Sequence, residues 1–340
     1  MNNDTNHPNG QYYYAPGYYA APPRVAPPAF KTNLRDLRRL SITAGLCVLG
    51  FIGLQFAVYF LLAFLGLADE FSNNLLFQNA FGAVYSVICV FLPFFAVSLF
   101  MNEKTREKTL LFGKPYAAGL MLLAVPAGFM FCMAGNYATN ALVALMDSAG
   151  VQLTAPESPV PSSALGMIFY VVQIAFIPAL TEEFALRGVV LQPLRKYGDR
   201  FAILMSAMVF ALMHGNMVQA PFAFIAGITI GYFVVATGSI WTGVLIHFAN
   251  NLFSSLLSLA NANSTLALDK PYAVMMTVSF VGGLACCVIF ALHSKRYKLR
   301  KTVTPVGALQ RFLNYVFTIP MILALAAIFY ITMDYIAFSG

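Results

Sequence analysis

The sequence predicts an all-α polytopic transmembrane helix bundle of about nine spans, with a disordered N-terminal tail. Of the 340 residues, 59% are hydrophobic and only 10% are charged, whereas an average soluble domain has about 25% charged residues. So few charges could not cover the apolar surface of a soluble protein of this size. Apolar runs of about 20 residues, the length that crosses a bilayer as a helix, also recur along the chain. Soluble fold classes are therefore excluded.

The chain divides into two parts of different composition. Residues 1–30 are rich in Pro, Tyr and Asn and contain no apolar core of the signal-peptide kind, which predicts a disordered tail. Residues 31–340 are predicted to form one transmembrane helical domain. Its expected spans are 41–67, 77–101, 117–141, 165–192, 201–214, 217–237, 239–260, 272–293 and 312–336. The fifth is short, and only Thr237, Gly238 and Ser239 separate the sixth from the seventh, which forces an antiparallel hairpin.

Basic clusters predict how these spans are oriented. They precede span one and separate spans two from three, four from five, and eight from nine. The clusters are Arg24, Lys31, Arg35, Arg38 and Arg39; Lys104, Arg106, Lys108 and Lys114; Arg195, Lys196 and Arg200; and Lys295, Arg296, Lys298, Arg300, Lys301 and Arg311. Alternating spans place all of them on one side, so the tail is expected in the cytoplasm and the C terminus outside. This orientation accounts for the net charge of +7 without a nucleic-acid partner.

Several ionisable residues lie inside the apolar runs, where they are costly. They are Glu182, Glu183, Arg187, His214 and His247. A charge at the bilayer centre costs about 2.5–3.5 kcal/mol even on the lenient insertion scale. Counted along their helices, Glu182 and His214 lie about 20 Å from the basic ends, and His247 about 14 Å from Gly238. Because these depths can coincide, the residues predict a functional site that faces the bundle interior.

Helix geometry separates the two adjacent glutamates. Glu183 and Arg187 are four residues apart and can pair on one helix face. Glu182 is rotated by about 100° from Glu183, so it meets the interior without an arginine from its own helix. Glu182 is therefore the candidate base, and the Glu183–Arg187 pair is expected to orient the helix.

Two further pairs share this four-residue spacing. His247 and Asn251 lie on one helix face, with Asn250 beside them, and Phe210 and His214 repeat the spacing on the fifth run. A carboxylate can take a proton from a water that an imidazole holds. A second imidazole and an amide can donate hydrogen bonds to a developing oxyanion. This combination predicts a hydrolase that acts on an amide bond.

A zinc site is the alternative arrangement. Two histidines and one glutamate form a known catalytic ligand set, which Glu182, His214 and His247 could supply. The H-E-x-x-H signature is absent, however, and the ligands would come from three helices. We therefore favour hydrolysis by a general base, with no cofactor.

The residues form three motifs that resemble those of a known family. Residues 182–187 read EEFALR, residues 210–214 FALMH and residues 247–251 HFANN. They are similar to the motifs EExxxR, FxxxH and HxxxN of the CAAX prenyl protease type II and bacteriocin-processing family of intramembrane proteases, also called CPBP or Abi. The resemblance covers about residues 165–256. Leu186 stands where many members carry Phe.

The resemblance implies an all-helical core with glutamate-dependent endopeptidase activity. By motif, Glu182 would activate water with help from His214, and His247 and Asn251 would stabilise the oxyanion. Four further residues would orient helices or substrate: the motif positions Glu183, Arg187 and Phe210, and Asn250 next to Asn251.

The family leaves the substrate open. Eukaryotic members cleave after a prenylated cysteine, and bacterial members are linked to peptide maturation, bacteriocin immunity and scaffolding. We expect a membrane peptide or protein substrate, prenylated or bearing a leader, in the lipid bilayer of a plasma (inner) membrane. Two other functions stay open: a non-catalytic scaffold or self-immunity protein on this fold, and a proton-coupled transporter. The oligomeric state is not predicted.

Overall fold

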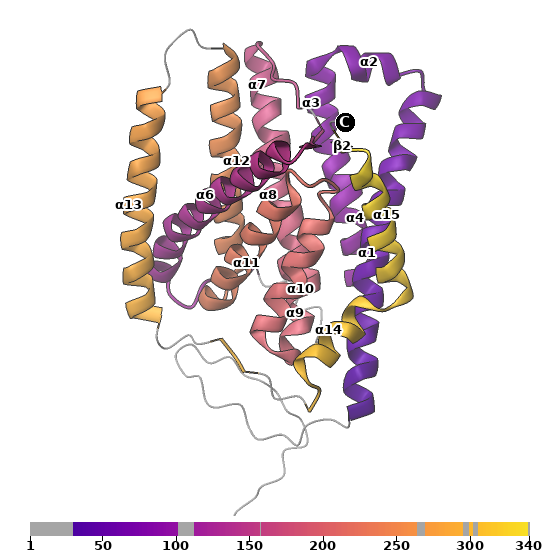
Figure 1. Cartoon of the computed structure of the whole chain (residues 1–340), viewed down its shortest axis with the longest axis vertical. Coiled ribbons are helices and arrows are strands. Elements are labelled where there is room, and N and C mark those ends of the chain that lie inside the picture. Colours follow the sequence, from indigo (N-terminus) through magenta and orange to yellow (C-terminus); the bar gives the residue numbers. More distant parts are fainter. Residues whose placement is uncertain are drawn as a thin grey trace, which may run out of the picture.

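The computed structural model of the chain describes residues 30–100, 112–156, 158–263, 269–294, 299–301 and 305–338. The predicted all-α membrane bundle is confirmed (Figure 1). In this described part, seven helices are long and apolar enough to cross a membrane, or eight if one bent pair counts as a span. The tail expected over 1–30 lies outside the described residues, apart from Phe30, where α1 begins. Arg24, Lys104, Arg106, Lys108, Lys295, Arg296 and Lys298 also lie outside them.

The N-terminal helices form one side of the bundle. They are α1 (Phe30–Phe64), α2 (Ala68–Asn73), α3 (Leu75–Ser86), the π-helical η1 (Val87–Phe91) and α4 (Leu92–Leu99). Asn74 begins α3, because its side chain accepts hydrogen bonds from the backbone N–H groups of Leu76 and Phe77. The apolar runs predicted over 41–67 and 77–101 thus become α1 and the continuous span α3–η1–α4.

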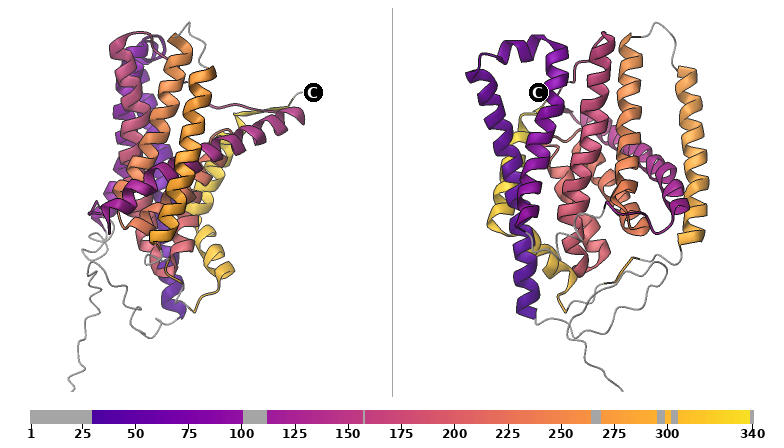
Figure 2. Two further views of the ribbon diagram at one scale, coloured as in Figure 1. Left: turned by 90° about the vertical axis from the view of Figure 1, so that its left-hand side faces the viewer. Right: turned by 180° about the vertical axis from the view of Figure 1, so that it is seen from behind.

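Helix α6 (Ala118–Ser148) crosses the bundle at a steep tilt (Figure 1). Its 31 residues rise about 46 Å, more than the roughly 30 Å of a hydrocarbon core. Figure 2 shows its C-terminal half leaving the bundle. There β1 (Val151–Leu153) pairs antiparallel with β2 (Ile336–Phe338), which joins the far end of α6 to the C-terminal end of the described chain.

The span that carries the two glutamates is a composite helix. It consists of α7 (Ala164–Val171), η2 (Val172–Phe176), α8 (Ile177–Glu183), η3 (Phe184–Leu191), α9 (Gln192–Leu194) and η4 (Arg195–Tyr197). Both η2 and η3 are π-helical, whereas η4 is a 3₁₀ turn. Wide π turns rotate the side chains that follow them, and they occur often at functional sites.

Helix α10 (Asp199–Leu212) is shorter than a span. Its 14 residues rise about 21 Å, so the run predicted over 201–214 does not cross the bilayer alone. It packs against α11 (Ala220–Thr237), and both lie in the lower half of the bundle in Figure 1. α10 and α11 run antiparallel, so α11 brings the chain back to the end of the bundle at which α10 begins. The basic clusters therefore still lie on one side of the membrane, as predicted. Gly238, at φ +73°, then turns the chain into α12 (Ile240–Asn263).

The C-terminal part adds α13 (Asp269–His293) and a broken span. The run predicted over 312–336 is divided into α14 (Ala308–Val316) and α15 (Ile319–Met333), which meet at 71°. Pro320 lies in the first turn of α15, where its missing N–H is tolerated. α15 packs along α1, and its C-terminal end contacts the α10–α11 turn.

Candidate active site

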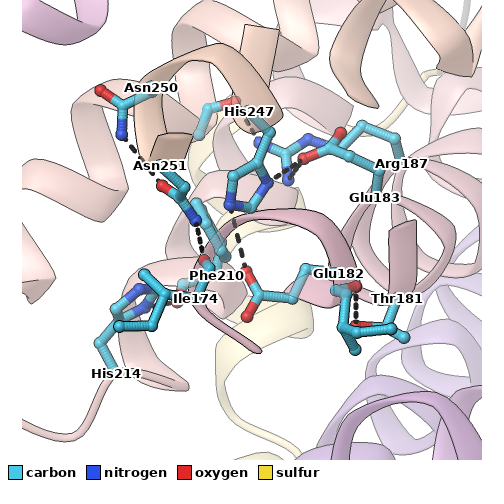
Figure 3. A network of polar contacts seen from close by, with 12 residues as sticks. Ile174, Thr181, Glu182, Glu183, Arg187, Phe210, His214, His247, Asn250 and Asn251 are labelled. Atoms are coloured by element: carbon cyan, nitrogen blue, oxygen red, sulfur yellow. Dashed lines mark hydrogen bonds and ion pairs between the residues drawn. The ribbon is translucent and has the colours of Figure 1, made fainter. Parts of the chain in front are cut away.

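The three motifs meet at one cavity of about 200 Å³ inside the bundle. Its lining includes all four residues to which sequence analysis gave catalytic roles. They are Glu182 from α8, His214 after α10, and His247 and Asn251 from α12. Phe210 and Asn250 line the same cavity, and Figure 3 shows how these side chains lie around one another. Segments up to 69 positions apart (182 to 251) thus contribute to a single polar site.

Glu183 and Arg187 form a fully buried ion pair. Glu183 Oε1 and Arg187 Nη1 are 2.9 Å apart, and both side chains are 0% exposed. Arg187 also donates to the carbonyl oxygen of Gly227, over 3.3 Å, and lies 4.9 Å from the centre of the Phe210 ring. The guanidinium therefore ties the composite span to α11 and α10.

His247 lies between the two glutamates. Its Nδ1 is 3.0 Å from Glu183 Oε1, and its Nε2 is 3.7 Å from Glu182 Oε2. A Cβ atom at Gly243 would lie 2.6 Å from Glu183 Oε2, so only glycine lets α12 approach α8 this closely. Spacing within one helix could not reveal this contact between helices, although Gly243 one turn before His247 is its signal in the sequence.

The two adjacent glutamates have different surroundings. The side chain of Glu182 is 20% exposed and lines the cavity, whereas that of Glu183 is completely buried. Glu183 is already engaged by Arg187 and His247. Glu182 is thus the carboxylate that a water molecule or a substrate can reach.

His214 stands where α10 ends. Its Nδ1 is 2.9 Å from the carbonyl oxygen of Phe210, which leaves Nε2 for other partners. Gly215 follows at φ +64°, and its carbonyl oxygen accepts a hydrogen bond of 3.1 Å from the hydroxyl of Thr332 on α15. A helix from the C-terminal end therefore supports the turn that carries His214.

Asn251 is held by the composite span. Pro178 has no N–H and cannot donate to the carbonyl of Ile174, four residues earlier. Asn251 donates to that oxygen instead, over 3.0 Å, and accepts from Asn250 Nδ2 at 3.1 Å. Because a primary amide has two N–H groups, one N–H of Asn251 remains for a ligand.

The described residues contain no assembled set of ligands for the alternative zinc site. Across the described residues, no group of three His, Cys, Asp or Glu side chains is placed to hold a metal ion. Zinc on Glu182, His214 and His247 therefore stays a prediction of the sequence.

One comparison with known proteins gives a match. Residues 164–253 match the family described as Type II CAAX prenyl endopeptidase Rce1-like. The matched segment holds all three motifs and nearly all of the core predicted over 165–256, so the resemblance is confirmed for this part of the chain. No curated protein and no solved structure matches the chain.

Proposed function

We propose that this multi-pass membrane protein, which resembles type II CAAX prenyl endopeptidases over residues 164–253, is an intramembrane endopeptidase that activates water with Glu182. The observation that carries the proposal is the contrast within one pair of glutamates. Glu182 faces a cavity shared with two imidazoles and an amide, while Glu183 is buried in an ion pair. One carboxylate is thus available for chemistry, and the other holds the site in place.

The proposed reaction is hydrolysis of a peptide bond. Glu182 takes a proton from a water molecule that His214 helps to hold, and the water oxygen bonds to the carbonyl carbon. The carbonyl π bond opens to an oxyanion, which accepts hydrogen bonds from His247 and from the remaining N–H of Asn251. When the C–N bond breaks, the proton on Glu182 passes to the leaving nitrogen. The products are a new carboxyl end and a new amino end.

His247 and Glu183 act together in this scheme. The Glu183 carboxylate accepts from Nδ1–H of His247, which fixes the ring with Nε2 on the side of Glu182. To donate to the oxyanion as well, His247 carries a second proton on Nε2 and acts as an imidazolium between the two glutamates. The oxyanion site and the base then lie next to each other. Arg187 balances the charge of Glu183, so that the buried carboxylate stays ionised in its place.

The walls of the cavity favour a membrane-associated substrate. Besides its polar residues, apolar side chains line it: Ile174, Pro178, Phe222, Ala226 and Ile230. They would accept an apolar group next to the scissile bond. The matching family's name suggests a prenylated peptide, and a leader-bearing peptide is the other choice. The proposed reaction needs no metal or other cofactor.

We also propose a plasma (inner) membrane location, with the N terminus cytoplasmic and the C terminus outside. Basic side chains support this orientation, because most of those of the described chain gather at the end where α1 begins. The exceptions are Arg187, which is buried in the ion pair with Glu183, and Lys270, in the first turn of α13. There Arg38 bonds Asn314 of α14, Lys196 pairs with Asp36, and Arg300 bonds Asp199. The positive-inside rule assigns such an end to the cytoplasm.

Comparison of membrane proteomes tests the proposed activity. Cells would carry the wild type, Glu182→Gln, or the control Asp147→Asn, which changes an exposed acid at the end of α6. We expect peptide termini that occur with the wild type and the control and disappear with Glu182→Gln. If the termini are the same in all three, the assignment as a protease is wrong, and a scaffold on this fold becomes the better account.

A further inference from the structure

The turn between α10 and α11 places another amide at the cavity. Gln219 lines the cavity together with Glu182, His214 and Asn251, but it belongs to none of the three motifs. It comes at the end of the turn that begins at His214, immediately before α11. The side chain is exposed there and leads into the space that the catalytic residues face.

A buried asparagine fixes the direction of this amide. Asn216 is only 1% exposed, and its side chain makes three hydrogen bonds within the turn. Its Nδ2 donates to the carbonyl oxygen of His214 at 2.8 Å and to Gln219 Oε1 at 3.0 Å, and its Oδ1 accepts from the backbone N–H of Gln219 at 2.9 Å. The oxygen of the Gln219 amide is therefore occupied, and the NH₂ group is the end left for a ligand.

The α10–α11 turn lies deep in the membrane, so the NH₂ group of Gln219 needs a hydrogen-bond acceptor near it. Gln219 follows the end of α10, about 21 Å along the helix axis from Asp199. At such a depth the cavity, and not the surrounding hydrocarbon, must supply the acceptor, because an unsatisfied donor in hydrocarbon costs several kcal/mol. Water in the cavity is one acceptor for the amide NH₂ of Gln219, and a carbonyl oxygen of a peptide that displaces this water is another.

Two amides then line one cavity from different helices. Asn251 on α12 uses one N–H for the carbonyl of Ile174, and Gln219 uses its oxygen for Asn216. Each keeps at least one N–H group for a ligand. An extended peptide presents a carbonyl oxygen at every residue, at a rise of about 3.3 Å. Carbonyls on neighbouring residues can therefore meet different amide donors.

We propose that Gln219 is a substrate-binding residue whose amide N–H donates to a main-chain carbonyl oxygen of the peptide, next to the scissile bond, and that Asn216 is its positioning residue. The proposal rests on the proposed endopeptidase function. It assigns the oxyanion to His247 and Asn251 and gives Gln219 the neighbouring carbonyl. Gln219 therefore stabilises bound substrate and transition state alike, and its loss changes KM rather than kcat.

Steady-state kinetics of the purified protein in lipid nanodiscs test this role. The probe is a fluorogenic peptide with a farnesylated cysteine followed by three residues. We expect Gln219→Ala and the isosteric Gln219→Glu to raise KM about tenfold, the effect of one net hydrogen bond, with kcat within twofold of the wild type. Asn216→Asp keeps the acceptor for the Gln219 backbone but loses the donor to its side chain, and should raise KM about threefold.

A matched control separates this from a general effect of losing a glutamine. Gln152→Ala removes an exposed glutamine of β1, outside the cavity, and should leave KM unchanged. Thermal unfolding of every variant shows that the protein remains folded. Wild-type KM in both Gln219 variants overturns the inference, as does a fall in kcat with KM unchanged.

Equilibrium binding of the same peptide distinguishes this inference from the proposed function. It is measured for the wild type, for Glu182→Gln and for Glu182→Gln combined with Gln219→Ala. We expect the double variant to bind about tenfold more weakly than Glu182→Gln. Equal binding by the two overturns the role of Gln219 even if Glu182→Gln abolishes cleavage.

Weaker binding in the double variant supports the role of Gln219 whether or not Glu182→Gln cleaves. Cleavage by Glu182→Gln overturns only the proposed mechanism. A wild type that neither binds nor cleaves the peptide overturns both.

Discussion

Two buried polar clusters of this protein invite comparison. The motif cluster, at the cavity, consists of Glu182, Glu183, Arg187 and His247. The basic-end cluster, at the start of α10, consists of Arg195, Asp199 and Arg300. Each has an acid beside arginine and almost no exposure of that acid: Glu183 is 0% exposed and Asp199 1%. The buried acids are thus alike, although Arg187 is fully buried and Arg300 is 37% exposed.

They differ in how completely their acceptors are used. Asp199 Oδ1 accepts from Arg195 Nε at 2.8 Å, and Oδ2 accepts from the backbone N–H of Arg300 at 2.7 Å. In the motif cluster, Glu183 Oε2 is buried without a hydrogen-bond partner among the described residues, and Glu182 faces a cavity. A fully satisfied network fastens helices together, whereas a carboxylate that faces a cavity, as Glu182 does, is available to a ligand. Substitutions in each cluster test whether the basic-end cluster only fastens helices while the motif cluster serves catalysis.

Breaking the buried ion pair should have the largest effect on stability. Arg187→Met removes the partner of a carboxylate that is 0% exposed. It should lower the free energy of unfolding by about 3–5 kcal/mol, because the charge of Glu183 stays buried with His247 alone. Unfolding by SDS in mixed micelles measures this change.

The double variant Glu183→Gln with Arg187→Met is its control. Removing both charges should restore most of the lost stability, since no uncompensated charge is left. If the double variant is no more stable than Arg187→Met, the destabilisation does not come from the unpaired carboxylate.

The basic-end cluster should matter for stability but not for chemistry. Asp199→Ala removes the acceptor shared by Arg195 and Arg300 and should cost about 1–3 kcal/mol of unfolding free energy. In nanodiscs, the folded variant should keep kcat within twofold of the wild type. Lys196→Ala is the matched control, because its ion pair with Asp36 is about half exposed and contributes about 0–1 kcal/mol. A loss of kcat in Asp199→Ala would contradict the claim that the basic-end cluster contributes to stability alone.

The pKa of Asp199 gives the basic-end cluster a dependence on pH. Burial alone would raise this pKa, but the attraction of Arg195 and Arg300 and their hydrogen bonds lowers it below the ordinary value of an aspartate. A carboxyl group whose pKa is lower in the folded state stabilises the fold above its unfolded pKa of about 3.9. That contribution is lost as the pH falls through the folded pKa.

The wild type and Asp199→Asn should therefore differ in how acid affects them. The stability advantage of the wild type should be full near neutral pH and shrink progressively below about pH 4. Unfolding measured over a pH series gives the difference between the two proteins. If the stability advantage of the wild type over Asp199→Asn grows as the pH falls, the pKa of Asp199 is not lowered in the folded protein.

The contact of α15 with the His214 turn should have the smallest effect. Thr332→Val removes a hydroxyl whose single hydrogen is shared between the carbonyl oxygens of Gly215, at 3.1 Å, and Ile328, at 2.8 Å. We expect a loss of about 0.5–1.5 kcal/mol in stability and a fall in kcat of a few fold, because the turn that carries His214 is less well held.

Thr277→Val is the corresponding control on α13. Thr277 donates to a carbonyl of its own helix, as Thr332 does, but its hydroxyl has no bond to the turn. It should leave kcat unchanged. Equal effects of the two substitutions would show that α15 does not support the site through Thr332.

Hydropathy and charge predicted most of the fold, because a span is a local property of about 20 residues. They predicted that the run over 201–214 is short, but they did not reveal that it does not cross the bilayer alone or that the last run bends by 71°. Both features depend on where neighbouring helices end, and the run over 201–214 looks equally apolar in either case. The steep tilt of α6 likewise depends on packing against α11 and α13.

The site was predictable as a set of residues but not as a set of contacts. Four-residue spacing predicts the proximity of Glu183 to Arg187, since both belong to one span. The contact of His247 with Glu183 depends on Gly243, and that of Asn251 with Ile174 depends on Pro178. Gln219 carried no signal, because its direction comes from Asn216 in an irregular turn.

The rate at which Glu182→Gln cleaves the farnesylated peptide in nanodiscs tests the central claim most directly. Glu183→Gln is the comparison, since it changes the neighbouring carboxylate, which lies outside the cavity lining. The account predicts that Glu182→Gln keeps the thermal stability of the wild type and loses about a thousandfold or more in kcat, the upper range for a general base. It predicts that Glu183→Gln loses stability as well as activity. Cleavage by Glu182→Gln at the wild-type rate would contradict the account.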